Sequence, residues 1–435
     1  MSASTRNAAR SGAAPNRDEE RSLPVRWLDT VTGRSLAPYQ TAVVRIGISL
    51  TWLCVLIREI PHRHTLYGPD SPWSMELAER ALSGYDGFTV LMWSSSDLWF
   101  EVVYFLGIAA SAAMLIGWRT RAMSVLVMVH VFSLQQRSPY VGDGGDMVLK
   151  LMTIYLAFVG CAQVWSLDAR RRARAEERGR SGGVDITGIV LWALLGAGLT
   201  VATTTGDLDR PRWVVALWAL WVAQAVWWAA GRWAAGEFRN AITALRNLFH
   251  NIVLLIMMFE VCLIYATSGW YKIQGSRWQD GTAVYYPMNV DDYAPWPEIS
   301  NLLSGNWALV LLMTYGTVFV QVAFPFTLLN RRVKNVLLVC LIAEHVAIGV
   351  LMALPFFSMA MIAADIIFLP TAFLLLLDDR VKRLLKRWFP RSGRQEATVP
   401  AGRGSGKTSK APQGKRATKP GKPDGGARKP QPQAS

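Results

Sequence analysis

A single lysine, Lys272, stands where a long apolar stretch gives way to an aromatic-rich loop. The apolar stretch begins near Phe249, and the loop carries Trp278 and Gly281 before an aromatic pair that starts at Tyr285. A lysine covered by aromatic rings at the end of a buried helix lies in a low-dielectric setting, which disfavours the ammonium form and can supply a neutral amine. Such an amine can act as a general base toward a weakly acidic proton.

The same lysine has a simpler interpretation. Lysines at the ends of membrane helices extend their stems along apolar surface and place the ammonium group at the boundary with water. The chemistry of the residues alone favours this interpretation over a catalytic base. Both interpretations stay open at this point, and the choice depends on what surrounds Lys272.

The elements that position Lys272 are predicted to be membrane helices. The chain has 435 residues, of which 51% are hydrophobic and 19 are tryptophans, and it contains repeated apolar runs of about twenty residues. The formal charge of +15 is concentrated in loops and in the tail after Asp379. Charge in these places acts as a topology signal and contacts the anionic lipid of the bilayer, so we expect no nucleic-acid partner.

The predicted fold class is all-α, a polytopic helical membrane bundle of about ten transmembrane helices. The expected spans cover about 38–57, 98–118, 121–132, 147–165, 186–204, 213–234, 249–271, 307–329, 333–354 and 356–377. Basic residues follow alternate spans, which predicts a multi-pass protein of the cell membrane with both termini cytoplasmic. This topology brings Lys272, the loop at 142–146 and the segment after Arg58 to the outer face.

The chain is expected to divide into four parts. They are a polar N-terminal arm (1–37) with a short surface helix near 25–31, a transmembrane domain (38–378), a basic amphipathic segment (379–390) and a disordered basic tail (391–435). The transmembrane domain includes an extra hairpin at 184–235, whose two spans carry almost no ionisable side chains.

Ionisable side chains at membrane depth are costly, so each needs a partner or a function. Those in the predicted spans are Arg45, His130, Lys150, Glu260, Glu344, His345 and Asp365. Asp146 is four residues before Lys150, so the two can pair on one helix face, and Glu260 can compensate Arg45. Structural contact between helices is the alternative explanation for each of these groups. The four cysteines and five histidines have no metal-ligand spacing, so no metal site is predicted.

Seven motifs occur in a fixed order along residues 38–377, interrupted only by the hairpin. They are VVRIGISL, TLYG, LIGWRTR, GGD, WSLDA, SGWYKIQGSRWQDG and EHVAIGVLMALPFFSMAMIAA. In kind and order they resemble the horizontally transferred transmembrane (HTTM) domain family, and the whole is similar to the membrane core of vitamin K-dependent gamma-glutamyl carboxylase. The lysine of the SGWYK motif, followed by a tryptophan and a glycine, is the most specific element of this resemblance.

The resemblance implies a catalytic set of Lys272, His345 and Asp146. Lys272 matches a lysine proposed to deprotonate vitamin K hydroquinone, His345 matches a histidine of the corresponding helix, and Asp146 falls near a position that carries histidine in the carboxylase. The implied pocket for substrate or quinone is lined by Arg45, Trp270, Trp278, Gly281 and Tyr285. The implied cofactor is vitamin K hydroquinone or, in a bacterial cell, menaquinol, with O₂ and CO₂ if carboxylation follows.

Two departures weigh against gamma-carboxylation itself. The carboxylase has a large luminal C-terminal domain where this chain has a short basic tail, and it lacks the hairpin at 184–235. The expectation is therefore an enzyme reduced to the membrane core, carboxylase-like (a lyase) or otherwise quinol-dependent, that modifies a secreted peptide together with a small partner membrane protein. The alternative is a non-catalytic membrane partner for maturation, export or immunity of such a peptide.

Overall fold

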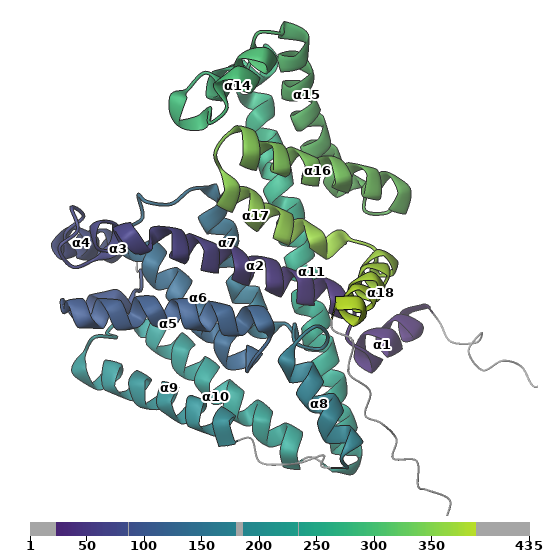
Figure 1. Ribbon diagram of the computed structural model, residues 1–435. Helices are drawn as coiled ribbons and strands as arrows, with labels where there is room; N and C mark the ends of the chain where they lie inside the picture. The colour runs from purple at the N-terminus through teal and green to yellow at the C-terminus, as the bar shows by residue number, and fades with distance from the viewer. Residues whose placement is uncertain (1–22, 86, 180–185, 234, 389–435) are drawn as a thin grey trace, which may run out of the picture. The chain divides into compact units, whose positions relative to one another are not determined.

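The structure is a computed structural model that describes residues 23–85, 87–179, 186–233 and 235–388 (Figure 1). Every regular element in these ranges is helical, which confirms the all-α class. The chain to Arg380 forms one compact unit, and the described residues beyond it are the end of the last helix. Most of the polar arm and the tail predicted over 391–435 lie outside the described residues.

The helices of the first half follow one another with short connections. Their bounds are α1 (Leu23–Gly33), α2 (Pro38–Glu59), η1 (Ile60–His62), α3 (Arg63–Tyr67), α4 (Met75–Tyr85), η2 (Val90–Trp93), α5 (Asp97–Ile116), α6 (Thr120–Arg137), α7 (Gly144–Phe158), α8 (Leu167–Glu177), α9 (Ile186–Thr205) and α10 (Pro211–Trp233). The short helix expected near 25–31 is α1.

The second half begins with the longest helix. The bounds are α11 (Gly236–Gln274), α12 (Ser276–Gln279), α13 (Tyr285–Met288), η3 (Asp291–Tyr293), α14 (Pro297–Ser304), α15 (Trp307–Ala323), η4 (Phe324–Thr327), α16 (Arg331–Leu351), α17 (Pro355–Asp365), η5 (Ile366–Phe368) and α18 (Thr371–Trp388). Helix α11 starts thirteen residues before the span predicted at 249–271, because no proline interrupts the amphipathic turns that precede the apolar stretch.

Seven of the described helices are long and apolar enough to cross a membrane, or eight if one bent pair counts as a single span. They make this a membrane protein by length and composition. The spans predicted over 121–132 and 147–165 correspond to α6 and α7, which are not among the seven. Helix α6 ends in the polar sequence Gln135, Gln136 and Arg137, and α7 has only 15 residues.

The span predicted over 356–377 differs in the structure from one straight helix. The axis bends by 112° between Pro355–Phe368 and Thr371–Leu384. Pro370 has no backbone N–H and crowds the residue before it, and Leu369 accordingly leaves the helical conformation with ψ of 140°. Helix α18 then continues without a break into the residues predicted as a separate amphipathic segment.

The core lies around α2, which packs against α5, α7 and α17 (Figure 1). Trp52 is almost fully buried, and its indole N–H donates to Nδ1 of His130 on α6 at 3.1 Å. Gly47 lies against Ala363 of α17 so closely that an added Cβ would be 2.5 Å from the alanine Cβ. Small residues at this crossing therefore allow the two backbones to approach.

Helices α9 and α10 occupy the position of the predicted hairpin and pack on each other through tryptophans. The rings of Trp192 and Trp221 are stacked with centroids 4.0 Å apart. Each indole N–H donates to the backbone carbonyl of the other residue, at 3.1 and 3.0 Å. The most apolar part of α10 has no buried residue, so most of the hairpin surface faces outward.

Candidate functional site

Lys272 lies in the last turn of α11, where its amine is held by two neutral groups. Nζ donates to Ser268 Oγ at 2.5 Å and to Gln321 Oε1 of α15 at 2.8 Å. The ring of Trp278, in the short helix α12 of the segment that follows α11, lies over the amine with its centroid 5.2 Å from Nζ. The lysine side chain is half-buried, so it is turned toward α15 and the loop.

Gln321 connects Lys272 to a carboxyl group. Its amide nitrogen donates to Glu344 Oε1 of α16 at 2.6 Å, while its amide oxygen accepts from Lys272 and from Ser268. Gln321 is 95% buried, which fixes the amide between the two ionisable groups. The amine and the carboxyl are therefore separated by a single amide, and together they form a centre that can hold a proton at either end.

A second buried cluster includes His345, the residue that follows Glu344 on α16. The hydroxyl of Tyr265 on α11 donates to Asp365 of α17, with both carboxyl oxygens at 2.8 Å. The same hydroxyl oxygen lies 3.0 Å from His345 Nε2. His345 Nδ1 has no hydrogen-bond partner among the described residues, and we assign the imidazole proton to Nε2, from which it can be donated to the Tyr265 hydroxyl oxygen. Tyr265, His345 and Asp365 are all at least 98% buried.

The loop after α11 is fastened to α15. The hydroxyl of Tyr315 donates to the backbone carbonyl of Gln279 at 2.7 Å, and Asp280 accepts from the Thr282 amide at 3.0 Å. The Thr282 hydroxyl also donates to Asp280, at 2.5 Å, and this bond is the main cause that lowers the pKa of the exposed Asp280 carboxyl, with the amide bond adding to it. Gly281 has φ of +76°, and a Cβ there would lie 3.1 Å from Leu311. This glycine lets the loop turn close over α15 and place Trp278 beside Lys272.

Replacing Gly281 by alanine is expected to destabilise the loop by about 1–2 kcal/mol, because a Cβ disfavours positive φ and contacts Leu311. Trp278 fluorescence cannot be isolated among 19 tryptophans, so limited proteolysis of the loop is the measurement. The matched control is Gly206→Ala, where φ is +86° but open space surrounds the position. Equal protease sensitivity of the two variants would contradict the packing role of Gly281.

The described contacts of the Lys272 amine do not include Trp270 or Tyr285. Trp270 is 61% exposed and Tyr285 is 44% exposed. The described ring contact of Tyr285 is an edge-to-face contact with Tyr286. Of the five residues assigned to a pocket from the sequence, the structure thus brings only Trp278 into contact with the amine, while Gly281 shapes the loop that carries it.

Arg45 is fully buried inside the bundle and binds backbone carbonyls. Its guanidinium donates to the carbonyls of Leu115 at 2.7 Å, Trp165 at 2.8 Å and Cys161 at 3.2 Å, and also to that of Met114. Carbonyls in the last turn of a helix lack a following turn of amide donors, and of the two α5 carbonyls only that of Met114 also accepts from the Gly117 amide, at 3.1 Å. Arg45 therefore ties the end of α5 to the segment after α7. Its described hydrogen bonds include neither Lys272 nor Glu260.

Asp146 lies at the start of α7 and caps that helix. Its two oxygens accept from the Asp143 amide at 2.7 Å and from Gln135 of α6 at 2.9 Å. The expected ion pair with Lys150 is not formed. The ammonium of Lys150 lies over the ring of Phe132 instead, 5.7 Å from its centroid. Asp146 is thus positioned away from the contacts of Lys272.

A polar cavity of about 270 Å³ lies beside Asp146. Its wall includes Glu59 at the end of α2 and Tyr67 of α3, joined by a hydrogen bond of 2.9 Å. Phe356 of α17 also lines it. The next residue, Phe357, contacts the His345 ring at a centroid distance of 5.6 Å and lies against Gly145. The two phenylalanines therefore separate the cavity from the Tyr265 cluster.

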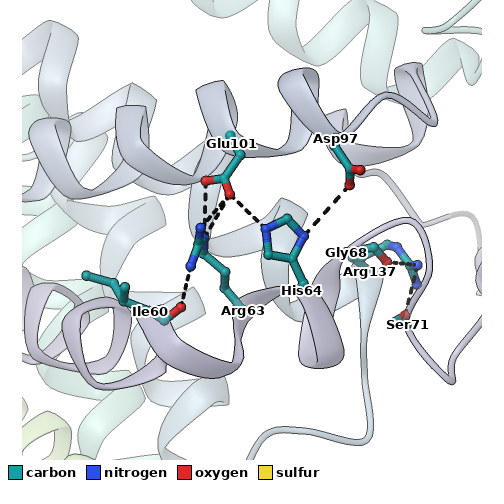
Figure 2. A network of polar contacts seen from close by, with 8 residues as sticks. All are labelled: Ile60, Arg63, His64, Gly68, Ser71, Asp97, Glu101 and Arg137. Atoms are coloured by element: carbon teal, nitrogen blue, oxygen red, sulfur yellow. Dashed lines mark hydrogen bonds and ion pairs between the residues drawn. The ribbon is translucent and has the colours of Figure 1, made fainter.

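Figure 2 shows how the segment after α2 is held beside this cavity. Arg63 and His64 both bind Glu101 of α5, with Arg63 Nη2 at 2.5 Å and His64 Nε2 at 2.7 Å from Oε1. His64 Nδ1 also lies 3.7 Å from Asp97. After Tyr67 in the chain, the Gly68 carbonyl and Ser71 Oγ accept from the buried Arg137, at 2.8 and 3.2 Å. These contacts hold the segment that carries Tyr67 in place beside the polar cavity.

The residues that sequence reasoning missed are the partners of Lys272 and His345. Ser268 and Tyr265 lie four and seven residues before Lys272, so helical spacing places them on its face. Gln321 is a single amide in an apolar helix. Its position signals a polar contact, but nothing local identifies Lys272 and Glu344 as the groups that it connects.

Within the described ranges, no group of three or more His, Cys, Asp or Glu side chains is placed to hold a metal ion. Neither a family model, nor a curated protein, nor a solved structure gave a significant match to this chain.

Proposed function

We propose that the protein is an integral membrane enzyme of the HTTM type in which the amine of Lys272 acts as a base toward an acidic hydroxyl of a lipid quinol. The observation that carries this proposal is the Lys272–Gln321–Glu344 chain. When the carboxyl holds the shared proton, the amine is neutral and can accept a proton from a quinol O–H, leaving an ammonium ion and a quinolate. Desolvation by the surrounding apolar helices favours this neutral arrangement.

The neighbourhood of the amine suits a planar lipid head group. Trp278 offers an aromatic face beside Nζ, and the loop that carries it lies at the end of an apolar helix. Vitamin K hydroquinone or menaquinol, when bound, would supply the acidic hydroxyl and the reducing equivalents for reaction with O₂, and CO₂ would enter only if carboxylation follows. His345 and Asp146 lie in separate clusters, so only Lys272 is assigned the role of base.

The proposed topology has about ten spans in the cell membrane, with both termini cytoplasmic and Lys272 at the extracytoplasmic face. Helices α6 and α7 would count as short spans within the bundle, and α17 with α18 as a bent one. The basic residues near Arg119, Arg172 and Arg246 would then share the cytoplasmic side. A secreted peptide, presented by a small partner membrane protein, would meet the quinol on the opposite side.

The test follows menaquinol consumption under O₂ by the full-length protein in mixed micelles. Lys272→Met and Lys272→Arg are both expected to lower the rate by on the order of 10²-fold or more, because methionine has no proton acceptor and arginine stays protonated. The arginine variant keeps a positive charge and hydrogen-bond donors, so it separates base chemistry from a structural role. Folding of each variant is checked by its elution volume and thermal unfolding.

Two outcomes would overturn the assignment. One is a wild-type protein that consumes menaquinol no faster than empty micelles. The other is a Lys272→Arg variant that retains the wild-type rate. In the second case the amine would serve only as a hydrogen-bond donor to Ser268 and Gln321.

A second function is favoured by the Tyr265–His345–Asp365 cluster. All three side chains are buried, they join α11, α16 and α17, and none of them lines the polar cavity beside Asp146. Such clusters hold membrane helices together. On this basis the protein would be a non-catalytic membrane partner in maturation, export or immunity of a secreted peptide, and Lys272 substitutions would leave that function intact whenever the protein folds.

A further inference from the structure

The hairpin of α9 and α10 lines two half-open cavities together with the rest of the bundle. The first, called here the apolar cavity, has about 280 Å³ and lies between the hairpin, α5 and α6. Figure 1 shows the hairpin lying alongside these two helices. Its wall is almost entirely apolar and includes Leu106, Leu126, Leu194, Leu199 and Leu217. A dry space of this kind suits a hydrocarbon chain.

The second cavity, called here the basic cavity, has about 900 Å³ and combines arginines with tryptophans. Four arginines line it (Arg119, Arg121, Arg171 and Arg172) against a single carboxylate, Asp168. Its other wall comes from the hairpin and includes Trp192 and Trp228. Cationic groups on one side and apolar rings on the other match the two halves of an amphiphile.

The one carboxylate in the basic cavity is already engaged. Asp168 accepts hydrogen bonds from the Thr120 amide at 2.8 Å and the Thr120 hydroxyl at 2.9 Å, at the start of α6. Arg171 lies 3.6 Å from it. No carboxylate of the described ranges pairs with Arg121 or Arg172 within 4 Å. Among the described residues, Asp168 is thus the one carboxylate that lines this cavity, and it pairs with neither Arg121 nor Arg172 within 4 Å.

The two cavities meet along the hairpin. Gln224 of α10 lines both, and the stacked pair of Trp192 and Trp221 contributes one ring to each. The cavity walls on α9 run from Gly188 to Leu199, about 16 Å along the axis at helical rise. A chain that reaches from the arginines to the apolar cavity would pass Gln224 and the Trp192–Trp221 pair.

We propose that the two cavities form one binding site for an anionic phospholipid, whose phosphate binds Arg121 and Arg172 and whose acyl chain occupies the apolar cavity. Arg172 donates to the Ala162 carbonyl at 2.5 Å through Nη2, which leaves its other N–H groups for the ligand. Arg121 lies over the ring of Trp227, with its guanidinium carbon 5.3 Å from the centroid, and its donors remain at the guanidinium edge. The site is independent of Lys272 and its chemistry.

The test uses the full-length protein after delipidation in detergent, with phosphatidylglycerol and phosphatidylcholine of identical acyl chains as probes and native mass spectrometry as readout. Phosphatidylglycerol is expected to bind at least tenfold more tightly. Arg121→Gln and Arg172→Gln are each expected to weaken it by about tenfold, since each removes charge-assisted hydrogen bonds. The matched control is Arg174→Gln on the same helix as Arg172, which does not line the cavity and should bind as wild type.

The acyl-chain half of the site has its own variant. Open space surrounds the Cβ position of Gly198, which faces the apolar cavity, so Gly198→Leu fills that cavity without a backbone clash. It is expected to weaken long-chain phosphatidylglycerol about tenfold and to leave a short-chain analogue unaffected. Gly231→Leu, also in open space on α10 but outside both cavities, is the control. Both glycines lie on the hairpin, and both variants keep all four arginines of the basic cavity. A loss of lipid binding in Gly198→Leu therefore tests the apolar cavity separately from the arginines.

Three results would overturn the site. If phosphatidylglycerol and phosphatidylcholine bind equally, the arginines do not select the lipid. If Arg174→Gln weakens phosphatidylglycerol binding as much as Arg121→Gln and Arg172→Gln do, the arginines act only through general surface charge. Competition by glycerol phosphate as effective as that by the intact lipid would identify a site for free phosphate and remove the lipid as its occupant.

Discussion

Replacing Arg45 by methionine is expected to lower the free energy of unfolding by about 3–5 kcal/mol, the largest effect that we predict for a single substitution. The guanidinium supplies hydrogen bonds to the carbonyls of Leu115, Cys161 and Trp165 in a fully buried place. Methionine fills a similar volume but leaves those carbonyls without a donor, and water has no access to replace it. The measurement is thermal or denaturant unfolding in detergent.

The control variants separate charge from geometry. Arg45→Lys keeps the charge but has fewer donors and no planar fork, so its loss should be intermediate. Arg332→Met removes an exposed arginine of α16 and should change stability by less than about 0.5 kcal/mol. If Arg45→Met unfolded at the wild-type temperature, the carbonyls of α5 would have to be satisfied in another way.

Tyr265→Phe is expected to lower the free energy of unfolding by about 2–4 kcal/mol. The substitution removes one hydroxyl and leaves two buried polar groups, Asp365 and His345, without the contact that they share. The comparison variant is Tyr155→Phe, whose hydroxyl lies 3.4 Å from Glu260 at a half-buried position and should matter little. Unfolding of both variants is followed in the same detergent.

A double-mutant cycle makes this prediction more specific. Asp365→Leu removes the carboxyl that needs a donor, so Tyr265→Phe should cost less in that background than in the wild type. Fully additive losses would mean that the hydroxyl does not act through Asp365. The cycle also distinguishes the Tyr265 cluster from Lys272, because neither substitution changes the contacts of the amine.

The sequence predicted the helix bounds correctly where a local signal, such as a proline or an apolar run, determines them. Pro38 starts α2 as expected, since a proline at the first helical position has no N–H to lose. The apolar runs predicted α5, α9, α10, α15 and α16 close to their bounds. The bend at Pro370 was missed because the surrounding residues are apolar enough to conceal it within a predicted span, although proline itself disfavours helix at the residue before it.

The candidate site was predictable only in part. Lys272 and Trp278 stand six residues apart, and their contact follows from a short loop that local sequence can suggest. The contacts of Gln321 and Tyr265 join residues separated by 49 and 100 positions. Such contacts depend on which faces of α11, α15 and α17 pack together, and the pattern of hydrophobic residues does not specify those faces. Arg45 illustrates the same limit, because an arginine that binds carbonyls and one that lines a pocket look alike in sequence.

The paired indoles of α9 and α10 have a consequence for biogenesis. A tryptophan N–H that enters hydrocarbon without an acceptor is costly, yet Trp192 and Trp221 each find theirs on the opposite helix. The hairpin can therefore form as a unit before it docks on the bundle, because neither indole N–H needs an acceptor from another segment.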